Sequence, residues 1–401
     1  MTLLLALAAL VIAGAISVLL GVLVLESLAA LSWNPSAAKG QPEQDSSVPT
    51  SVVVLIPAQN EAARIAATIQ AVQAEAVHGW QILVIAHNCD DDTALVARDA
   101  GARVLTLRDG GDLGKPAALR LGIAELERES PEIVLILDAD CLPERGALTL
   151  LAQQSQKYQQ PCMPAYLLAA SPEGGAFSSV SSGACWIKNF LRPLGLYRMG
   201  LPCLISGSGV VMPFGQLRSV EQGQGSIAED YQLTIDLLRK GHATRFVPLA
   251  RVHSGLPSVQ GSAMRQRTRW EHGHLQLTLV EAPRLLLEAL WHRSFYRFVI
   301  GLELLTPPIS LLGLGWCLVL IGILALQWFL GWGGAVTWAF WLHLGSAILC
   351  FSAVTAALLR FRGAKSTFSF LAHLPAYALS KLSIYLGFLW SRERNWRRTD
   401  R

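Results

Sequence analysis

Hydrophobic residues dominate both ends of this chain, while its middle alternates between short apolar runs and amphipathic stretches. Residues 1–33 are almost entirely apolar, and residues 1–25 contain no charged side chain. A helix of about 20 apolar residues is long enough to cross the hydrocarbon core of a bilayer. A cleaved signal peptide is the competing interpretation, but the basic segment that opens such peptides is missing. We therefore expect residues 1–33 to form an N-terminal transmembrane helix.

The middle of the chain, residues 51–283, has the pattern of an α/β domain and follows a polar, proline-containing linker at residues 34–50. Four apolar runs predict buried strands, at residues 52–56, 81–86, 104–107 and 133–137. Helical spacing of apolar residues predicts helices between them, at residues 60–74, 92–100 and 115–127. Strands that alternate with helices indicate a mostly parallel, Rossmann-like sheet. Ligands of such sheets bind at the carboxyl ends of the strands.

The C-terminal part, residues 284–401, is apolar again and ends in a basic tail. Its first stretches predict an interfacial or re-entrant helix and then two transmembrane spans, at residues 284–306, 309–331 and 335–359. The last stretch, residues 368–390, contains Lys381 and is either a span or a helix in the membrane plane. As a span it would leave one of its two flanking basic groups outside, against the positive-inside rule.

Composition agrees with a membrane protein that has one sizeable domain. Of 401 residues, 52% are hydrophobic and only 15% are charged, whereas soluble domains carry about 25% charged residues. The net charge of +4 is too small to indicate nucleic acid binding. Seven cysteines without a C-x-x-C pair indicate reduced thiols in a domain that faces the cytosol. We expect a multi-pass protein with a cytoplasmic central domain that contacts membrane lipids.

Two carboxylates follow the run at residues 133–137. Asp138 and Asp140 lie two residues apart where a strand turns, so both can ligate one metal ion. Oxygen ligands suit Mg²⁺ or Mn²⁺, which bridge to diphosphate oxygens. The alternative is that these aspartates only cap a turn.

Further candidates lie downstream. Asp230, preceded by Glu229, opens a helical stretch and is either an N-cap or a general base for an acceptor hydroxyl. In the motif that begins at Gln266, Arg269 can neutralise a diphosphate, and Trp270 offers a flat face to a sugar ring. A juxtamembrane basic and aromatic helix is the alternative interpretation of that motif.

Two glycine-containing turns add possible contacts. Lys115 follows a glycine where a helix opens, a place where a lysine and free N–H groups can hold phosphate. Gly207 and Ser208 belong to a Ser-Gly-Ser-Gly turn that allows a ligand to approach the backbone closely. A solvated lysine and a plain tight turn are the alternatives.

In their order and spacing these motifs resemble the family 2 glycosyltransferases with the D, D-x-D, E-D and Q-x-x-R-W signature. That family includes the synthases of cellulose, chitin and hyaluronan and the ceramide glucosyltransferases. The resemblance begins at residues 54–61 and continues through residues 266–274 to the tail at residues 396–401, so it covers nearly the whole chain. It is strongest to bacterial members.

The resemblance implies a GT-A fold and inverting, single-displacement transfer of a sugar from a nucleotide-sugar, a UDP-sugar, in the inner membrane of a bacterium. Asp138 and Asp140 would hold Mg²⁺ or Mn²⁺, and Asp230 would be the base. Glu229 would steady the Asp230 segment. The donor would contact Pro57, Asn60, Glu61, His87, Asp91, Lys115 and Asp138. The remaining catalytic and acceptor contacts would be Gln266, Arg269, Trp270, Gly207 and Ser208.

One position departs from the family pattern. His87 stands where many relatives have an aspartate that contacts the uracil of the donor. Either His87 replaces this contact, or Asp90 or Asp91 provides it instead.

Three functions follow from these features. The first is the addition of one sugar or a few to a membrane lipid or oligosaccharide acceptor, which the small number of expected spans favours. The second is a processive polysaccharide synthase that also moves its polymer across the bilayer. The third is a non-catalytic membrane scaffold, which the retained carboxylates, Arg269 and Trp270 disfavour.

Overall fold

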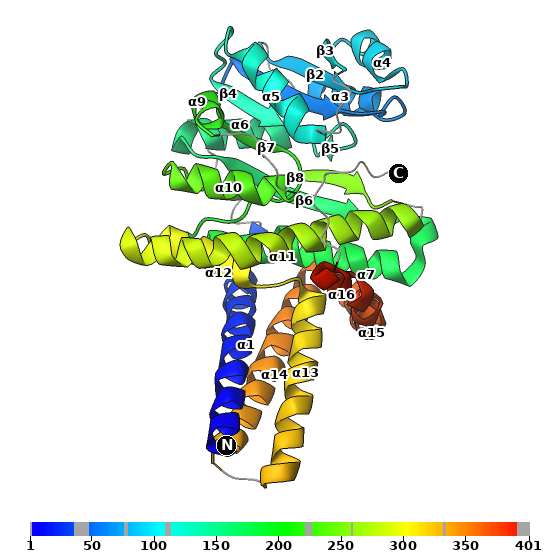
Figure 1. Ribbon diagram of the computed structural model, residues 1–401. Coiled ribbons are helices and arrows are strands. Elements are labelled where there is room, and N and C mark those ends of the chain that lie inside the picture. Colours follow the sequence, from blue (N-terminus) through cyan, green and yellow to red (C-terminus); the bar gives the residue numbers. More distant parts are fainter. Residues whose placement is uncertain are drawn as a thin grey trace.

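The structure, a computed structural model, describes residues 2–35, 48–75, 79–108, 114–220, 227–257, 260–331 and 334–390. Most of the expected linker at residues 34–50 and the basic tail after residue 390 lie outside the described residues. Figure 1 shows three layers: a domain with a β-sheet, a layer of helices beneath it, and a stem of long helices below that.

The domain is built on an eight-stranded sheet with the order β3-β2-β1-β4-β7-β6-β8-β5. The strands are β1 (Val52–Ala58), β2 (Gln81–His87), β3 (Arg103–Leu107), β4 (Ile133–Ile136), β5 (Leu142–Pro143), β6 (Cys162–Ala169), β7 (Val210–Pro213) and β8 (Arg245–Gly255). Strands β1 to β4 are parallel, as the four apolar runs predicted. Strand β7 is antiparallel to β4 and β6, while β6 and β8 are parallel. The sheet is therefore mixed, with its parallel half at the N-terminal side of the domain.

Apolar side chains cover both faces of the sheet. Every residue of β1 is buried, which is why its sequence is a continuous apolar run. One core lies between the sheet and the helices α3 (Ile65–Gln73), α4 (Thr93–Asp99) and α6 (Ala147–Tyr158). The other lies under α5 (Gly114–Leu126), α9 (Phe214–Arg218) and α10 (Glu229–Arg239). The carboxyl ends of β1 and β4 lie at the edge of both cores and face the helical layer.

Helix α3 begins later than the spacing predicted, at Ile65 instead of residue 60. Asn60 has a φ of 53°, which takes the chain out of helical geometry. The N–H of Ala62 donates to Oδ2 of Asp91 over 3.1 Å, so the loop after β1 is fixed to the loop after β2. This tertiary contact delays the helix.

The layer beneath the sheet contains helices from the middle and the end of the chain. It includes α7 (Gly175–Trp186), the π-helical turn η2 (Ile187–Leu191), α8 (Arg192–Arg198), α11 (Gln260–Trp291), α12 (Phe295–Leu305), α15 (Ala364–Ser380) and α16 (Leu382–Trp390). A short 3₁₀ turn, η1 (Pro172–Gly174), precedes α7. The sequence predicted one helix at residues 284–306. In the structure α11 ends within this range at Trp291, and α12 begins within it at Phe295. The hydroxyl of Ser294 caps α12 by accepting from the N–H of Arg297.

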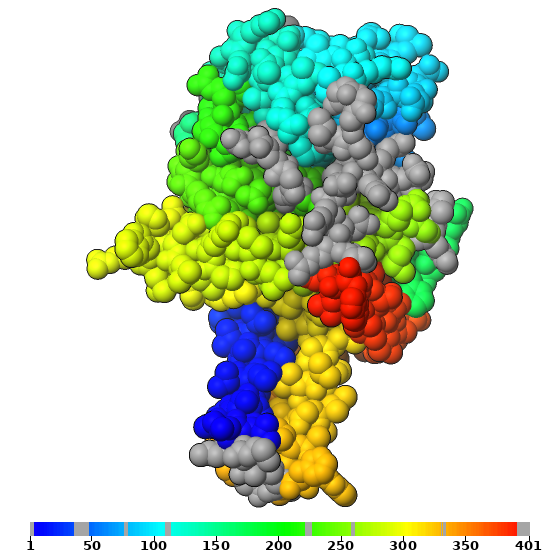
Figure 2. All heavy atoms as spheres, viewed as in Figure 1, coloured from blue at the N-terminus to red at the C-terminus, as the bar shows by residue number. Residues whose placement is uncertain are grey.

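Three helices are long and apolar enough to cross a membrane: Leu4–Leu31, Ile309–Phe329 and Gly334–Arg362. They belong to α1 (Thr2–Leu31), α13 (Ile309–Leu330) and α14 (Gly334–Arg362), which pack side by side. Figure 2 shows α1 and α13 as a narrow stem that projects from the broader domain. Many large apolar side chains on this stem are exposed, such as Leu4, Leu318, Trp328 and Trp338. These helices coincide with the three predicted spans.

The final apolar stretch, residues 368–390, is broken at Lys381 into α15 and α16. Neither helix is among those that are long and apolar enough to cross a membrane. Both lie at the level of α7 and α11, above the stem (Figure 1). Lys381 itself is buried and forms an ion pair with Glu271 of α11. Of the two alternatives for this stretch, the arrangement fits a helix pair beside the membrane surface.

Candidate functional site

A cavity of about 310 Å³ lies between the carboxyl ends of the parallel strands and the helical layer. At the sheet end it is lined by Pro57, His87 and Asp138, which follow or end β1, β2 and β4. At the opposite end its lining includes Leu23 of α1 and Ile309 of α13. The cavity thus extends from the sheet to helices that can span a membrane.

Asp138 has a cation beside it at the sheet end. Nζ of Lys115, at the start of α5, lies 2.7 Å from Oδ1 of Asp138. The backbone N–H of Asp138 donates to the hydroxyl of Ser208 over 2.7 Å, which fixes the turn after β4. Burial opposes the charge of Lys115, but Asp138, Asp230 and Glu229 raise its pKa above the ordinary value. Lys115 therefore remains a cation that faces the carboxylates.

Asp140 lies on the same turn and also lines the cavity. Its Oδ2 accepts a hydrogen bond of 2.8 Å from the hydroxyl of Ser254 in β8. Within the described ranges no group of three or more His, Cys, Asp or Glu side chains is arranged for a metal ion. The donor set is the pair of carboxylates from Asp138 and Asp140. This fits Mg²⁺ or Mn²⁺, since such ions often take one or two carboxylates and complete their shell with water and substrate phosphates.

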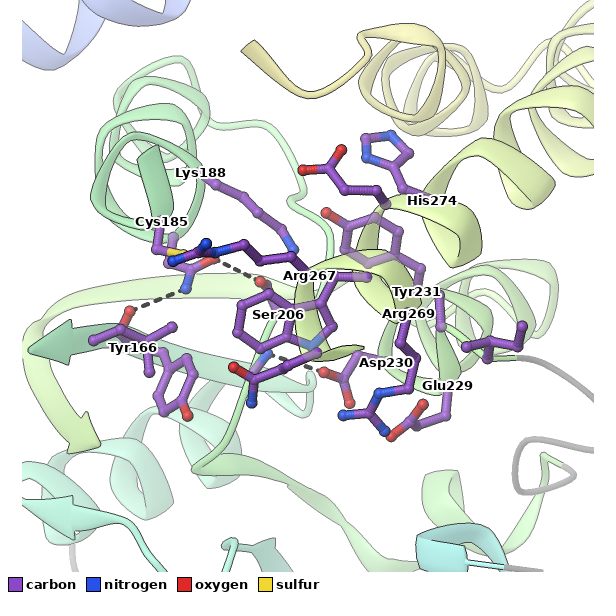
Figure 3. Close-up of a pocket in the computed structure, with 18 of the residues that line it drawn as sticks. Tyr166, Cys185, Lys188, Ser206, Glu229, Asp230, Tyr231, Arg267, Arg269 and His274 are labelled. Atoms are coloured by element: carbon purple, nitrogen blue, oxygen red, sulfur yellow. Dashed lines mark hydrogen bonds between the residues drawn. The ribbon is translucent and has the colours of Figure 1, made fainter. Parts of the chain in front are cut away.

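Asp230 is not the N-cap of its helix, because Ala228 holds that position. Oδ2 of Asp230 instead accepts a hydrogen bond of 3.0 Å from the N–H of Gly207. Figure 3 shows this bond and the carboxylate of Asp230 facing the cavity. Burial and the nearby Asp138 raise the pKa of Asp230, while Lys115 and the N–H of Gly207 oppose the rise. A fixed carboxylate of raised pKa is suited to accept a proton.

Glu229 and Arg269 lie beside Asp230. In Figure 3 the guanidinium of Arg269 approaches the carboxylate of Glu229. Burial raises the pKa of Glu229 to about 6, and the charge of Asp230 adds to the rise, while Lys115 and Arg269 oppose it. The protonation of Glu229 therefore depends on the charge of Asp230 beside it.

The turn at Gly207 needs glycine because space and backbone angle both exclude a side chain. Its φ is 87°, and a Cβ would lie 2.0 Å from Cδ1 of Tyr166. Gly207 lines the cavity. Ser208 is 2% exposed and supports the Asp138 turn from behind. Of the three residues expected at the acceptor, Gly207 and Trp270 line the cavity and Ser208 does not.

The residues expected at the donor fall into two groups. Pro57, Glu61, His87, Lys115 and Asp138 line the cavity. Asn60 and Asp91 lie behind it and join two loops: Oδ1 of Asn60 accepts from the N–H of Asp90 over 2.7 Å, and Asp91 accepts from Ala62. His87 is 3% exposed, and its Nε2 lies 3.2 Å from Nδ2 of Asn88. At the cavity, the second strand therefore presents His87 and not Asp91.

Helix α11 contributes the motif that begins at Gln266. Gln266, Arg269 and Trp270 all line the cavity that Asp230 also lines. Arg267 and Glu271 of the same helix line it as well. Glu271 pairs with Lys381 and accepts from the hydroxyl of Tyr385 over 3.2 Å, which attaches α16 to α11.

Several lining residues were not singled out as site residues in the sequence. They lie at the end of the cavity near the stem and include Leu23, Lys188, Pro307, Pro308, Ile309, Ser310 and Tyr377. Lys188 is a lone lysine in an apolar helical stretch, so no local pattern marks it. Pro307 and Pro308 break an apolar zone of the sequence. This break was the one sequence feature that could have indicated the end of the cavity near the stem.

Residues 49–273, more than half of the chain, match the model of a family described as glycosyltransferase like family 2. The chain is 25% identical over 255 residues to the probable glycosyltransferase YdaM of Bacillus subtilis (strain 168), a match that covers 57% of this chain and 56% of that protein. It is also 25% identical over 172 residues to an N-acetylglucosaminyltransferase of Neorhizobium galegae, covering 41% of this chain and 40% of the relative. The matches thus span about half or less of these relatives.

A solved structure shares the fold over almost the whole chain. It is the mannosyltransferase PcManGT from Pyrobaculum calidifontis in complex with GDP-Man and Mn²⁺, with a TM-score of 0.53 and 15% identity. The likeness covers 96% of this chain and 100% of that one. The expected GT-A fold with flanking membrane helices is confirmed.

Proposed function

Since the chain belongs to the glycosyltransferase-like family 2, we propose that it transfers a sugar from a nucleotide-sugar, a UDP-sugar, to a membrane lipid or lipid-linked oligosaccharide. The enzyme would lie in the inner membrane of a bacterium, with its sheet domain in the cytoplasm. The transfer would invert the anomeric carbon in one displacement.

One observation carries the lipid acceptor. A single cavity contains both the carboxylates of Asp138, Asp140 and Asp230 and the first residues of α13, with Leu23 of α1 beside them. An acceptor held in the membrane can therefore reach Asp230 from the stem end, while a water-soluble donor enters at the sheet end. This geometry favours an amphipathic acceptor over a soluble one.

The residues at the sheet end would bind and orient the donor. Asp138 and Asp140 would hold the metal ion, which when bound supplies charge that stabilises the departing diphosphate. Lys115 beside Asp138 and Arg269 beside Glu229 are cations of the same cavity and would offset the remaining negative charge of the leaving group.

Asp230 would act on the acceptor. Its free carboxylate oxygen takes the proton of the attacking hydroxyl as the new bond to the anomeric carbon forms, and the bond from that carbon to the diphosphate oxygen breaks. The N–H of Gly207 keeps the carboxylate in place. Glu229 supports the segment, and Trp270 faces the sugar.

Addition of one sugar or a few remains our preferred outcome over processive synthesis. A polymer channel needs several packed spans with a polar lining, and the described part of the chain offers three candidate helices. Product sizing with labelled donor would decide, because long polymer would refute the preference.

The test of the proposal uses membranes, a panel of labelled UDP- and GDP-sugars, and two matched variants. Asp230→Asn should abolish transfer and leave nucleotide binding nearly intact, since the amide cannot accept the proton. Asp236→Asn, two turns along the same helix and hydrogen-bonded to Gln232, is the control and should keep activity. Unchanged transfer by Asp230→Asn would refute the base, and no transfer from any donor by the wild type would refute the function.

A further inference from the structure

The cations that line the cavity differ in how their charge is neutralised. Lys115 pairs with Asp138, and Arg192 pairs with two glutamates, Glu26 and Glu303. Lys381 pairs with Glu271. Each of these cations has a carboxylate of the chain itself within ion-pair distance. An incoming anion would have to compete with that carboxylate.

Lys188 and Arg267 line the same cavity but have a different environment. Among the residues that the structure describes, neither has a carboxylate within ion-pair distance. Each lies over an aromatic face instead: Nζ of Lys188 is 5.0 Å from the ring centre of Tyr231, and Cζ of Arg267 is 5.6 Å from that of Tyr377. Lys188 is exposed to the cavity and Arg267 is half-buried. Lys188 also has a hydrogen bond to Tyr231 and lies within the field of Asp230. Among the described residues neither cation is held in an ion pair by the chain itself, which leaves room for an anionic ligand.

The two side chains share one neighbourhood. In Figure 3 both lie on the side of Asp230 where Cys185 and His274 are found, away from Glu229. Burial raises the pKa of the Cys185 thiol, and Lys188, Lys381 and Arg267 all act against that rise. Both cations therefore act on the same thiol, which agrees with their common location in Figure 3.

The same end is next to apolar surface. Leu23 of α1 and Ile309, where α13 begins its candidate span, line the cavity. They pack in the same apolar cluster as Ile187, which precedes Lys188, and Tyr377, whose ring lies under Arg267. The sheet end has the opposite character, because the carboxylates of Asp138 and Asp140 gather there. A metal-bound diphosphate suits the acidic end. An anion with an apolar chain suits the other end.

We propose that Lys188 and Arg267 form a phosphate subsite for the acceptor, and that the acceptor is a phosphate-bearing lipid whose hydroxyl reaches Asp230. This inference rests on the proposed function, since it names the acceptor class of the same site. Arginine and lysine are the usual partners of phosphate oxygens, and arginine offers two donors to them at once. The phosphate would lie between the hydroxyl at Asp230 and the lipid chain along α1 and α13.

The test measures binding of three probes to the purified full-length protein in neutral detergent: hexyl phosphate, hexanol and inorganic phosphate. Hexyl phosphate should bind about tenfold or more tightly than either of the others, since it combines a charge-assisted contact with an apolar chain. Equal binding of hexanol would overturn the phosphate subsite. Equal binding of inorganic phosphate would overturn the lipid, because it would show a site for free phosphate.

Variants connect the binding to the two residues. The double variant Lys188→Gln with Arg267→Gln should lose this advantage of hexyl phosphate, and the conservative pair Lys188→Arg with Arg267→Lys should retain most of it. Lys157→Gln is the matched control, because Lys157 also lies over a tyrosine, 5.4 Å from the ring centre of Tyr158, but outside the cavity lining. Unchanged hexyl phosphate binding in the double glutamine variant would overturn the assignment.

Binding of UDP in the same samples separates the two proposals. The double glutamine variant should bind UDP within about twofold of the wild type, which also shows that it is folded. A parallel loss of UDP and hexyl phosphate, in a variant whose thermal unfolding is unchanged, would assign the cations to the donor diphosphate and overturn the subsite. Failure of the wild type to bind any nucleotide would count against the proposed function and leave the hexyl phosphate result standing.

Discussion

A buried cation between two carboxylates joins three parts of the fold that are distant in sequence. Nε of Arg192 in α8 donates to Oε2 of Glu26 in α1, and Nη2 donates to Oε1 of Glu303 in α12, each over 2.8 Å. The side chains of Arg192, Glu26 and Glu303 are 11%, 1% and 6% exposed. The group therefore connects the N-terminal helix of the stem to the helical layer with little access for water.

The substitution Arg192→Met should strongly destabilise this junction. Methionine replaces much of the volume, but two buried carboxylates then face each other without a cation. Removal of one partner from a buried ion group costs about 3–5 kcal/mol. Replacement of the whole group by Arg192→Met, Glu26→Gln and Glu303→Gln removes the unpaired charges, so the triple variant should regain most of that loss.

The assay is the midpoint of thermal unfolding in neutral detergent, followed by tryptophan fluorescence. Arg284→Met is the control, because Arg284 forms a similar pair with Glu281 at 3.0 Å but is 63% exposed. Exposed pairs contribute only about 0–1 kcal/mol, so its midpoint should hardly change. The reasoning would be wrong if Arg192→Met lost no more stability than Arg284→Met, or if the triple variant were as unstable as the single one.

Two further predictions concern the reaction itself. Transfer should rise with pH through about 6, because Glu229, with a pKa of about 6, and the neighbouring Asp230 must lose their shared protons before Asp230 can act as a base. Glu229→Gln removes one of the coupled charges and should move the rise in transfer rate to lower pH. A kcat that does not change with pH around 6 would contradict the role of Asp230 as the base. Excess chelator should stop transfer, and added Mn²⁺ or Mg²⁺ should restore it. Asp140→Asn should raise the metal concentration needed for half-maximal rate, whereas full activity in chelator would exclude the metal.

The parallel half of the sheet was predictable because its signal is local. Strands β1, β2 and β4 are almost continuous apolar runs, as expected for strands that are covered on both faces, while β3 at the edge of the sheet is shorter and partly exposed. The other half is determined by pairing between distant segments, for example Cys162 of β6 with Arg245 of β8. No short window of sequence contains that information, so none of the strands β5, β6, β7 and β8 was predicted.

The candidate site shows the same division between local and distant information. Asp138 and Asp140 could be placed because they end a recognisable strand, and Asp230 because it opens a recognisable helix. Asn60 and Asp91 were expected at the donor, but a polar residue in a loop can bind a ligand or another loop, and in the structure they join two loops. Whether such a residue contacts a ligand depends on where its partner lies, which only the folded chain determines.

The distribution of charge in the cavity gives Asp230 a particular place in the proposed reaction. Asp138 and Asp140 lie at the sheet end. Lys188 and Arg267, which have no carboxylate within ion-pair distance among the described residues, lie beside the apolar cluster that includes helices of the stem. An anionic lipid would be repelled by the carboxylates, so the stem end is its favourable direction of entry. At the sheet end a bound metal ion would offset the repulsion between the carboxylates and the donor diphosphate. Asp230 lies between the two regions, and the N–H of Gly207 holds its carboxylate. The base can therefore remain fixed while both substrates are brought to it from opposite sides.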